Sequence, residues 1–162
     1  MNQFAASTGI AESELSDYEN TLKDIYTNNY GDSFEDVADA MAAVTQQMGD
    51  LDQASLQNIT ESAFTLRDTF GYDINESVRA ANTMMTQFGI EGDKAMGLIA
   101  TGAQNGLDFS GELLDSISEY SVQFAKSGLT LMICSKSWKR ALKPALSIWT
   151  RLATPLKKCL FV

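Results

Sequence analysis

The feature that most constrains the fold of this chain is a helical period in its apolar residues, which runs from residue 11 to residue 127. Apolar side chains recur at steps of three and four, so each stripe lies along one face of a helix. No alternating pattern of useful length, as expected for a β-strand, occurs anywhere. The stripes predict about six helices of roughly 10 to 18 residues, joined by loops of roughly 2 to 6 residues.

Capping residues and glycines mark where these helices begin and end. The stripes are Leu15, Tyr18, Leu22, Ile25 and Tyr26; Phe34, Val37, Met41, Val44 and Met48; Leu56, Ile59, Ala63, Leu66 and Phe70; Ile74, Val78, Ala81, Met85 and Phe88; and, after a short helix over 91–104, Leu113, Leu114, Ile117, Tyr120 and Phe124. Ser33 and Ser55 are the predicted N-caps, and Ser110 is the predicted start of the last helical region. The predicted stops are Gly31, Gly49, Gly71, Gly89 and Gly128.

Two weak echoes indicate internal repetition. "TFGYDINESVRAA" (69–81) and "QFGIEGDKAMGLI" (87–99) share a Phe-Gly joint, and "NYGDSFEDVADAM" (29–41) shares an aromatic helix start with "QNGLDFSGELLDSI" (104–117). Stacked helical hairpins produce such echoes. We therefore predict an all-α fold, either an antiparallel helical bundle or stacked hairpins. We expect an N-terminal extension at 1–10, an acidic helical domain at 11–130 and a poorly ordered or non-native tail at 131–162.

Composition argues against most enzyme classes. The chain has no histidine, which removes the commonest general base and zinc ligand, and Cys134 and Cys159 fit no redox or metal motif. We assign no catalytic, cofactor-binding or metal-binding residue. The first 20 residues do not resemble an export signal and no apolar run is long enough to span a membrane, so we expect a cytoplasmic location.

The acidic residues are interpreted as caps and solvated faces. The group of Asp32, Glu35, Asp36 and Asp39 lacks the alternating donors and central glycine of a calcium loop. The glycines of "GIEGDKAMG" are neither preceded by a strand nor followed by Lys-Ser or Lys-Thr, so they indicate helix punctuation rather than a phosphate loop.

Charge reverses sharply near residue 130. All 21 acidic residues precede it together with only five basic ones, whereas residues 131–162 carry seven basic residues and no acid. The acidic region is not expected to bind nucleic acid. Tryptophans and cations interleave in the tail, which is typical of a membrane-surface helix or a calmodulin-target-like peptide, although Pro144 and Pro155 argue against one continuous helix.

The genetic code offers another interpretation of the tail. Methionine and tryptophan have one codon each, so their bases are known. Read from the second base, Met132-Ile133 gives a stop codon. Read from the third base, Met132-Ile133, Trp138-Lys139 and Trp149-Thr150 force Asp, Glu and Asp, which places acids where the present frame has none. We therefore predict a one-base deletion near codons 130 and 131.

Three stretches carry a family resemblance: "NNYGDSFEDVADAM", "DTFGYDINESVRAANTMMTQFGI" and "GLIATGAQNGLDFSGELLDSISEYSVQFAKSGLT". Over residues 5–130 the chain resembles the conserved helical part of phage tail tape measure proteins. The resemblance implies a structural protein of a siphophage or myophage tail, which lies in the tail tube lumen, sets tail length and leaves with or ahead of the DNA during ejection. It also implies the tail tube and tail assembly chaperone proteins as partners.

The resemblance carries no catalytic motif. Members of the family run to several hundred residues or more, so we expect this chain to be a prophage-derived fragment that has lost length determination. A truncated domain exposes apolar surface, so we also expect self-association. The competing hypothesis is an acidic helical interaction protein whose basic tail binds anionic lipid.

Overall fold

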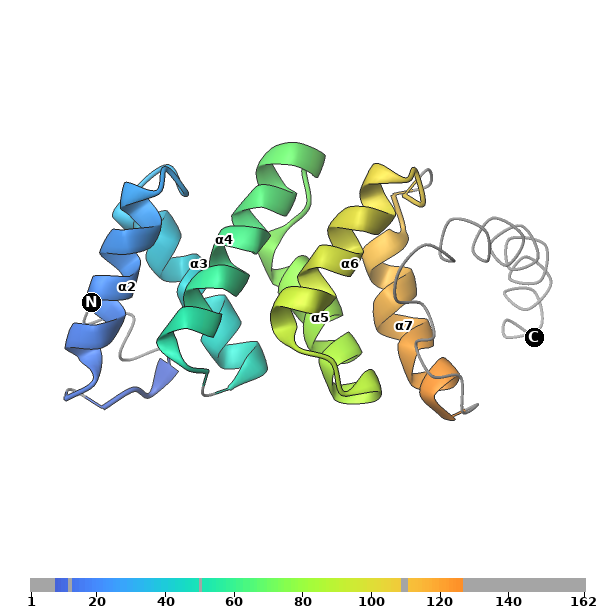
Figure 1. Ribbon diagram of the computed structural model, residues 1–162, viewed down its shortest axis with the longest axis horizontal. Helices are drawn as coiled ribbons and strands as arrows, with labels where there is room; N and C mark the ends of the chain where they lie inside the picture. Colours follow the sequence, from blue (N-terminus) through green and yellow to red (C-terminus); the bar gives the residue numbers. More distant parts are fainter. Residues whose placement is uncertain (1–7, 12, 50, 109–110, 127–162) are drawn as a thin grey trace, which may run out of the picture. The chain divides into compact units, whose positions relative to one another are not determined.

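The computed structural model describes residues 8–11, 13–49, 51–108 and 111–126, and the described part contains α-helices and no strand (Figure 1). The described residues hold six helices, which confirms the predicted all-α class: α2 (Leu15–Thr27), α3 (Phe34–Met48), α4 (Gln53–Phe70), α5 (Ile74–Phe88), α6 (Gly92–Gln104) and α7 (Leu113–Lys126). The predicted tail at 131–162, most of the predicted extension at 1–10 and Ser110 lie outside the described residues.

The described helices form a stack of hairpins rather than a closed bundle. Each helix packs chiefly against the next two along the chain, so α2, α4 and α6 form one layer and α3, α5 and α7 form the other (Figure 1). The first and last helices of this series share no comparable contact. Of the two architectures that the sequence left open, the stack is the one observed.

Equivalent helices begin at regular intervals. The first layer starts at Leu15, Gln53 and Gly92, and the second starts at Phe34, Ile74 and Leu113. These intervals are close to the roughly 40-residue period of some helical solenoids. The sequence echo between 29–41 and 104–117 covers the starts of α3 and α7, which are equivalent helices of one layer. The echo between 69–81 and 87–99 relates helices of different layers. It reflects the similar Phe-Gly joints that follow α4 and α5.

Helix ends follow the predicted chemistry, with two corrections. Ser33 Oγ accepts a hydrogen bond from the Asp36 amide at 3.1 Å and caps α3 as predicted. Ser55 does not cap α4, because the carboxylate of Asp52 lies one turn earlier and accepts from both the amide (3.0 Å) and the hydroxyl (2.7 Å) of Ser55. Glycines at positive φ follow α3, α4 and α5 as predicted, at positions 49, 71 and 89.

The stop predicted for α2 was also displaced. The helix ends at Thr27 with Asn28 as its C-cap, and Asn29 adopts a positive φ of 67°, which asparagine tolerates better than most residues. Gly31 lies beyond it, and its lack of a side chain matters for a different reason. A Cβ there would be 2.6 Å from Cγ2 of Val37.

The predicted stripes form the core between the two layers. Phe64, Met41, Ile59 and Ile99 are among the side chains that are less than 2% exposed, and each such burial stabilises the fold by about 1.5–3 kcal/mol. Met41, Met84 and Met96 are also buried, so these methionines fill the core rather than a binding face. Tyr26 and Phe34 are exceptions, because 38% and 51% of their surfaces are exposed.

Polar contacts join each hairpin to the next. Thr21 on α2 donates to Gln53 Oε1 at 2.7 Å, and Asn82 on α5 donates to the carbonyl of Gln47 at 2.6 Å. Apolar contacts do the same where Ile59 of α4 packs on Gly92 of α6, because a Cβ on Gly92 would collide with the Ile59 side chain. The hairpin faces therefore fit one another closely.

Candidate interaction site at the hairpin corners

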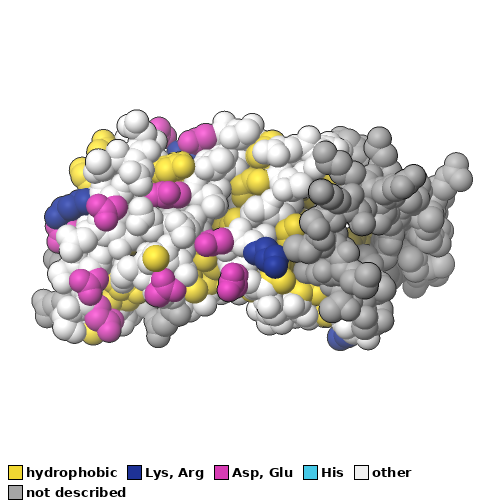
Figure 2. Space-filling model, viewed as in Figure 1, with side chains coloured by type: hydrophobic (Ala, Val, Ile, Leu, Met, Phe, Trp, Pro, Cys, Tyr) yellow, Lys and Arg dark blue, Asp and Glu magenta, His cyan; other side chains and the backbone are white. Residues whose placement is uncertain are grey.

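Acidic side chains dominate the surface of the described helices. Figure 2 shows Asp and Glu distributed over the visible face, with few Lys or Arg groups among them. Within the described residues, no group of three or more His, Cys, Asp or Glu side chains is placed to hold a metal ion. The cluster around Asp36 instead engages a single arginine.

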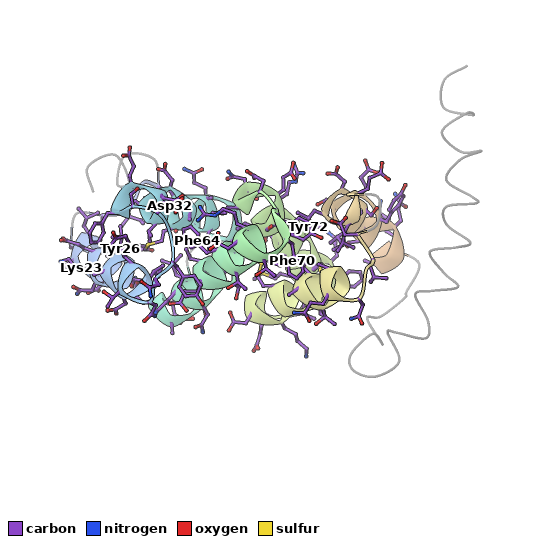
Figure 3. All side chains as sticks on the ribbon, turned by 90° about the horizontal axis from the view of Figure 1, so that it is seen from above. Lys23, Tyr26, Asp32, Phe64, Phe70 and Tyr72 are labelled. Atoms are coloured by element: carbon purple, nitrogen blue, oxygen red, sulfur yellow. The ribbon has the colours of Figure 1, made fainter. Side chains whose placement is uncertain are left out.

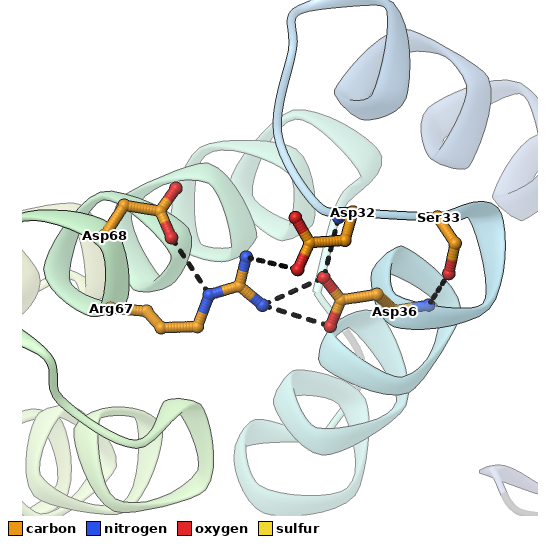
Figure 4. A network of polar contacts seen from close by, with 5 residues as sticks. All are labelled: Asp32, Ser33, Asp36, Arg67 and Asp68. Carbon is orange, nitrogen blue, oxygen red and sulfur yellow. Dashed lines mark hydrogen bonds and ion pairs between the residues drawn. The ribbon is translucent and has the colours of Figure 1, made fainter.

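Arg67 is the centre of this polar network, which joins α4 to α3 (Figure 4). Its Nη1 donates to Oδ2 of Asp36 at 2.8 Å and to Oδ1 at 3.1 Å, and its Nε donates to Oδ1 of Asp68 at 3.0 Å. Oδ2 of Asp36 also accepts from the Asp32 amide at 2.9 Å. The network fixes the corner between α2 and α3 against the end of α4.

Arg67 also rests on an aromatic ring. Its guanidinium carbon is 4.6 Å from the centroid of Phe64, and the Tyr30 ring lies 6.4 Å from the same ring in a stacked arrangement. A cation over a ring face is attracted by the ring quadrupole. The ring therefore supports the arginine from the core side while the carboxylates hold it from outside.

The charges of the network stabilise one another. Burial would raise the pKa of Asp36, but hydrogen bonds from Arg67 and from the Asp32 amide outweigh it and hold the pKa below its ordinary value. Burial would lower the pKa of Arg67, but its bonds to Asp36 and Asp68 raise it on balance. Both groups are therefore ionised at neutral pH, which suits a structural ion pair.

A groove of about 470 Å³ lies beside this network, between α3 and the start of α5. Small apolar side chains form part of its lining, since Ala40 and Ala43 of α3 face Ile74 of α5 across it. Its polar lining comprises Asp36, Asp39, Arg67, Tyr72, Asp73 and Asn75. Three carboxylates against one guanidinium make the groove negative.

A second polar contact links the corners of neighbouring hairpins. The hydroxyl of Tyr72, in the α4–α5 corner, donates to Oδ2 of Asp108 at 2.7 Å, and Oδ1 of Asp108 accepts from the amide of Leu113 at the start of α7. Burial, together with the hydrogen bond to Asp108, raises the pKa of Tyr72 far above its ordinary value. Phe70 stacks on the Tyr72 ring with 5.8 Å between centroids.

An exposed aromatic pair lies on the first hairpin. Tyr26 of α2 and Phe34 of α3 stack with ring centroids 4.2 Å apart, and they are 38% and 51% exposed. Figure 3 labels Tyr26, on α2, and places it apart from Phe70 and Tyr72. The sequence placed both residues in core stripes. Stacking on each other gives them a partner without burial.

The site around Arg67 was not predicted. In the sequence Arg67 is one of five scattered basic residues before residue 130, and a single sequence does not show that α4 packs on α3 and brings Asp36 to Arg67. The spacing along the sequence was a signal for this site, because Arg67 lies in α4 and the preceding helix, α3, has an acidic first turn. That signal alone does not select a partner.

The fold and these surfaces define an all-α protein of stacked hairpins whose described polar clusters hold helices together. Residues 24–132 match the model of the family described as phage-related minor tail protein, and the chain belongs to that family. It is therefore a structural protein of the phage tail class, and its place is with the other components of a tail. No curated protein and no solved structure matches the chain.

None of the described helices is both long and apolar enough to cross a bilayer.

Proposed function

We propose that residues 11–130 are the conserved helical region of a tape measure protein, whose intact parent takes part in tail assembly and determines tail length. The family match over residues 24–132 is the observation that carries the proposal, because it coincides with the acidic stack and stops close to the charge reversal. The stacked hairpins support it further, because such a stack offers a broad surface for contacts with other tail proteins.

The same proposal accounts for the tail. Residues 131–162 are the product of a reading frame displaced by one base, so the chain is a prophage-derived fragment that does not determine length alone. The three acids forced at codons 132, 138 and 149 support the displaced frame. The intact parent would lie in the lumen of the virion tail and contact the tail tube and tail assembly chaperone proteins, while this chain would stay in the host cytoplasm.

The coding DNA tests the frame directly. After one added base near codon 130, we expect an open frame that continues the acidic, helical pattern and extends the family match. A stop within a few codons, or a family match that does not extend, would contradict the frame displacement. The match over residues 24–132 would still hold in that case, so the two parts of the proposal fail separately.

The alternative function is an acidic interaction protein with a basic, membrane-binding tail. The interleaved tryptophans and cations of residues 131–162 favour it. Flotation of the full chain with vesicles of anionic lipid separates the two functions. Salt-sensitive binding that is lost when residues 131–162 are removed would support the alternative, and absence of flotation would support the tape measure proposal.

A further inference from the structure

Neighbouring helices of the second layer are held together differently in the two halves of the stack. Between α5 and α7, Nη2 of Arg79 lies 3.5 Å from Oδ1 of Asp115 and bridges the two helices. Between α3 and α5 no ion pair exists within the described residues, and the groove of about 470 Å³ occupies this space. Because α3, α5 and α7 are equivalent helices of one layer, their residues can be compared position by position.

The first backbone hydrogen bond of each helix fixes the register. It runs from Val37 to Ser33 in α3, from Ser77 to Asp73 in α5 and from Ser116 to Glu112 in α7. In this register Asp39 of α3 corresponds to Arg79 of α5.

The acidic partner of Arg79, Asp115, can be compared in the same register. Asp115 of α7 corresponds to Glu76 of α5. The bridge between Arg79 and Asp115 therefore has a like-charged counterpart, Asp39 and Glu76, in the preceding repeat. The position that Arg79 occupies in α5 is therefore occupied by an acid, Asp39, in α3.

The groove at this position suits a cationic side chain with an apolar stem. Asp39 makes no ion pair within the described part of the chain, while Asp36 is already held by Arg67. Alanines at 40 and 43, which are 3% and 7% exposed, leave room for a methylene chain beside the carboxylates. Arginine and lysine combine such a stem with a charged head.

We propose that the groove between α3 and α5 receives an arginine side chain from a basic segment of another protein, in the position that Arg79 holds between α5 and α7. The negative lining supplies the charge complementarity, and Arg79 with Asp115 supplies the precedent within the same fold. This inference rests on the groove and the repeat register, and it stands apart from the tape measure proposal.

The test measures binding of a fluorescently labelled peptide, Ala-Ala-Arg-Ala-Ala-Arg-Ala, to the full chain by anisotropy. The control peptide carries citrulline, which keeps the shape of arginine without its charge. We expect the arginine peptide to bind more tightly than the citrulline peptide. Asp39→Asn should weaken arginine-peptide binding by about fivefold, as expected for one partly screened ion pair.

Two further variants separate the groove from general acidity. Asp24→Asn removes the same charge from an exposed position on α2, and it should leave binding unchanged. Asp39→Arg places an arginine where α5 has Arg79, so it should raise the melting temperature and abolish peptide binding. This second readout remains informative if the asparagine variant folds poorly.

Three results would overturn the proposal. The arginine peptide could fail to bind the wild-type chain, it could bind no better than the citrulline peptide, or Asp24→Asn and Asp39→Asn could weaken it equally. Equal weakening would show that only overall charge attracts the peptide.

Discussion

Arg67 and Asp36 form a bidentate pair across two helices, with Nη1 of the arginine 2.8 Å and 3.1 Å from the two carboxylate oxygens. The side chains are 27% and 28% exposed, so solvent screens the pair only partly. The pair joins the corner of the first hairpin to the end of α4, and both of its residues line the groove between α3 and α5. Its removal therefore affects both stability and the shape of the groove.

Replacing Arg67 by methionine should destabilise the chain by about 1–2 kcal/mol, because Asp36 loses its charged partner while the stem is kept. Urea unfolding followed by circular dichroism measures this change. Lys94→Met is the matched control, since Lys94 is exposed and makes no ion pair within the described residues. Equal destabilisation by the two substitutions would contradict the role given to Arg67.

Asp36 should make stability depend on acid pH. Its pKa is lower in the folded chain than the ordinary 3.8, because the hydrogen bonds from Arg67 outweigh the effect of burial. Such a group contributes stability above its ordinary pKa and loses it as the pH falls through the folded pKa. The difference in unfolding free energy between wild type and Asp36→Asn should thus be full near pH 6 and shrink below about pH 4. A difference that is constant with pH would refute this assignment.

Gly92 and Gly97 of α6 should respond in opposite directions to alanine. A Cβ at Gly92 collides with Ile59, so Gly92→Ala should cost about 1–3 kcal/mol. No described residue outside the helix backbone lies within 4 Å of a Cβ at Gly97, so Gly97→Ala should stabilise the helix by about 0.5–1 kcal/mol. Thermal unfolding of both variants tests the contact between α4 and α6.

A double variant identifies the cause. Ile59→Val removes the methyl group that meets Gly92, and it should recover part of the loss when combined with Gly92→Ala. Strict additivity of the two substitutions would mean that the side chains do not meet.

Within the described part of the chain, the buried hydroxyl of Ser77 has no hydrogen-bond partner, so Ser77→Ala should be neutral or stabilise the chain by about 1 kcal/mol. Thr60 gives the contrast, because its equally buried hydroxyl donates to the Leu56 carbonyl at 2.7 Å. Thr60→Val should destabilise by about 0.5–1.5 kcal/mol. Chemical denaturation that ranks the two variants the other way would show that Ser77 has a partner.

Most of the helix ends could be predicted from the sequence. Ser33, Gly49, Gly71 and Gly89 act within a single turn, so short-range capping rules locate them. Ser55 was misassigned because Asp52, three residues earlier, caps the amide of Ser55, so the helix already begins before Ser55. The rules do not rank two good caps that stand so close together.

The stacking of the hairpins and the site around Arg67 could not be predicted from the sequence alone. A stripe places Phe34 on the apolar side of α3, but it does not show that the ring stacks on Tyr26 and stays 51% exposed. Arg67 and Asp36 are far apart in sequence, and their contact depends on how α3 packs on α4. Single-sequence periodicity carries no information about that packing.

The surfaces, the groove and the repeat register all depend on the helices forming an open stack. Spin labels on α2 at Asn20 and on α7 at Glu119, with Cys134 and Cys159 replaced by serine, allow double electron–electron resonance to measure the separation of these helices. Labels at Lys23 and Thr65, on α2 and α4, give the reference for neighbouring helices. The stack predicts an α2–α7 distance at least about twice the roughly 8–10 Å between packed helices, and clearly longer than the reference. A distribution that coincides with the reference would mean a closed bundle and would contradict the account.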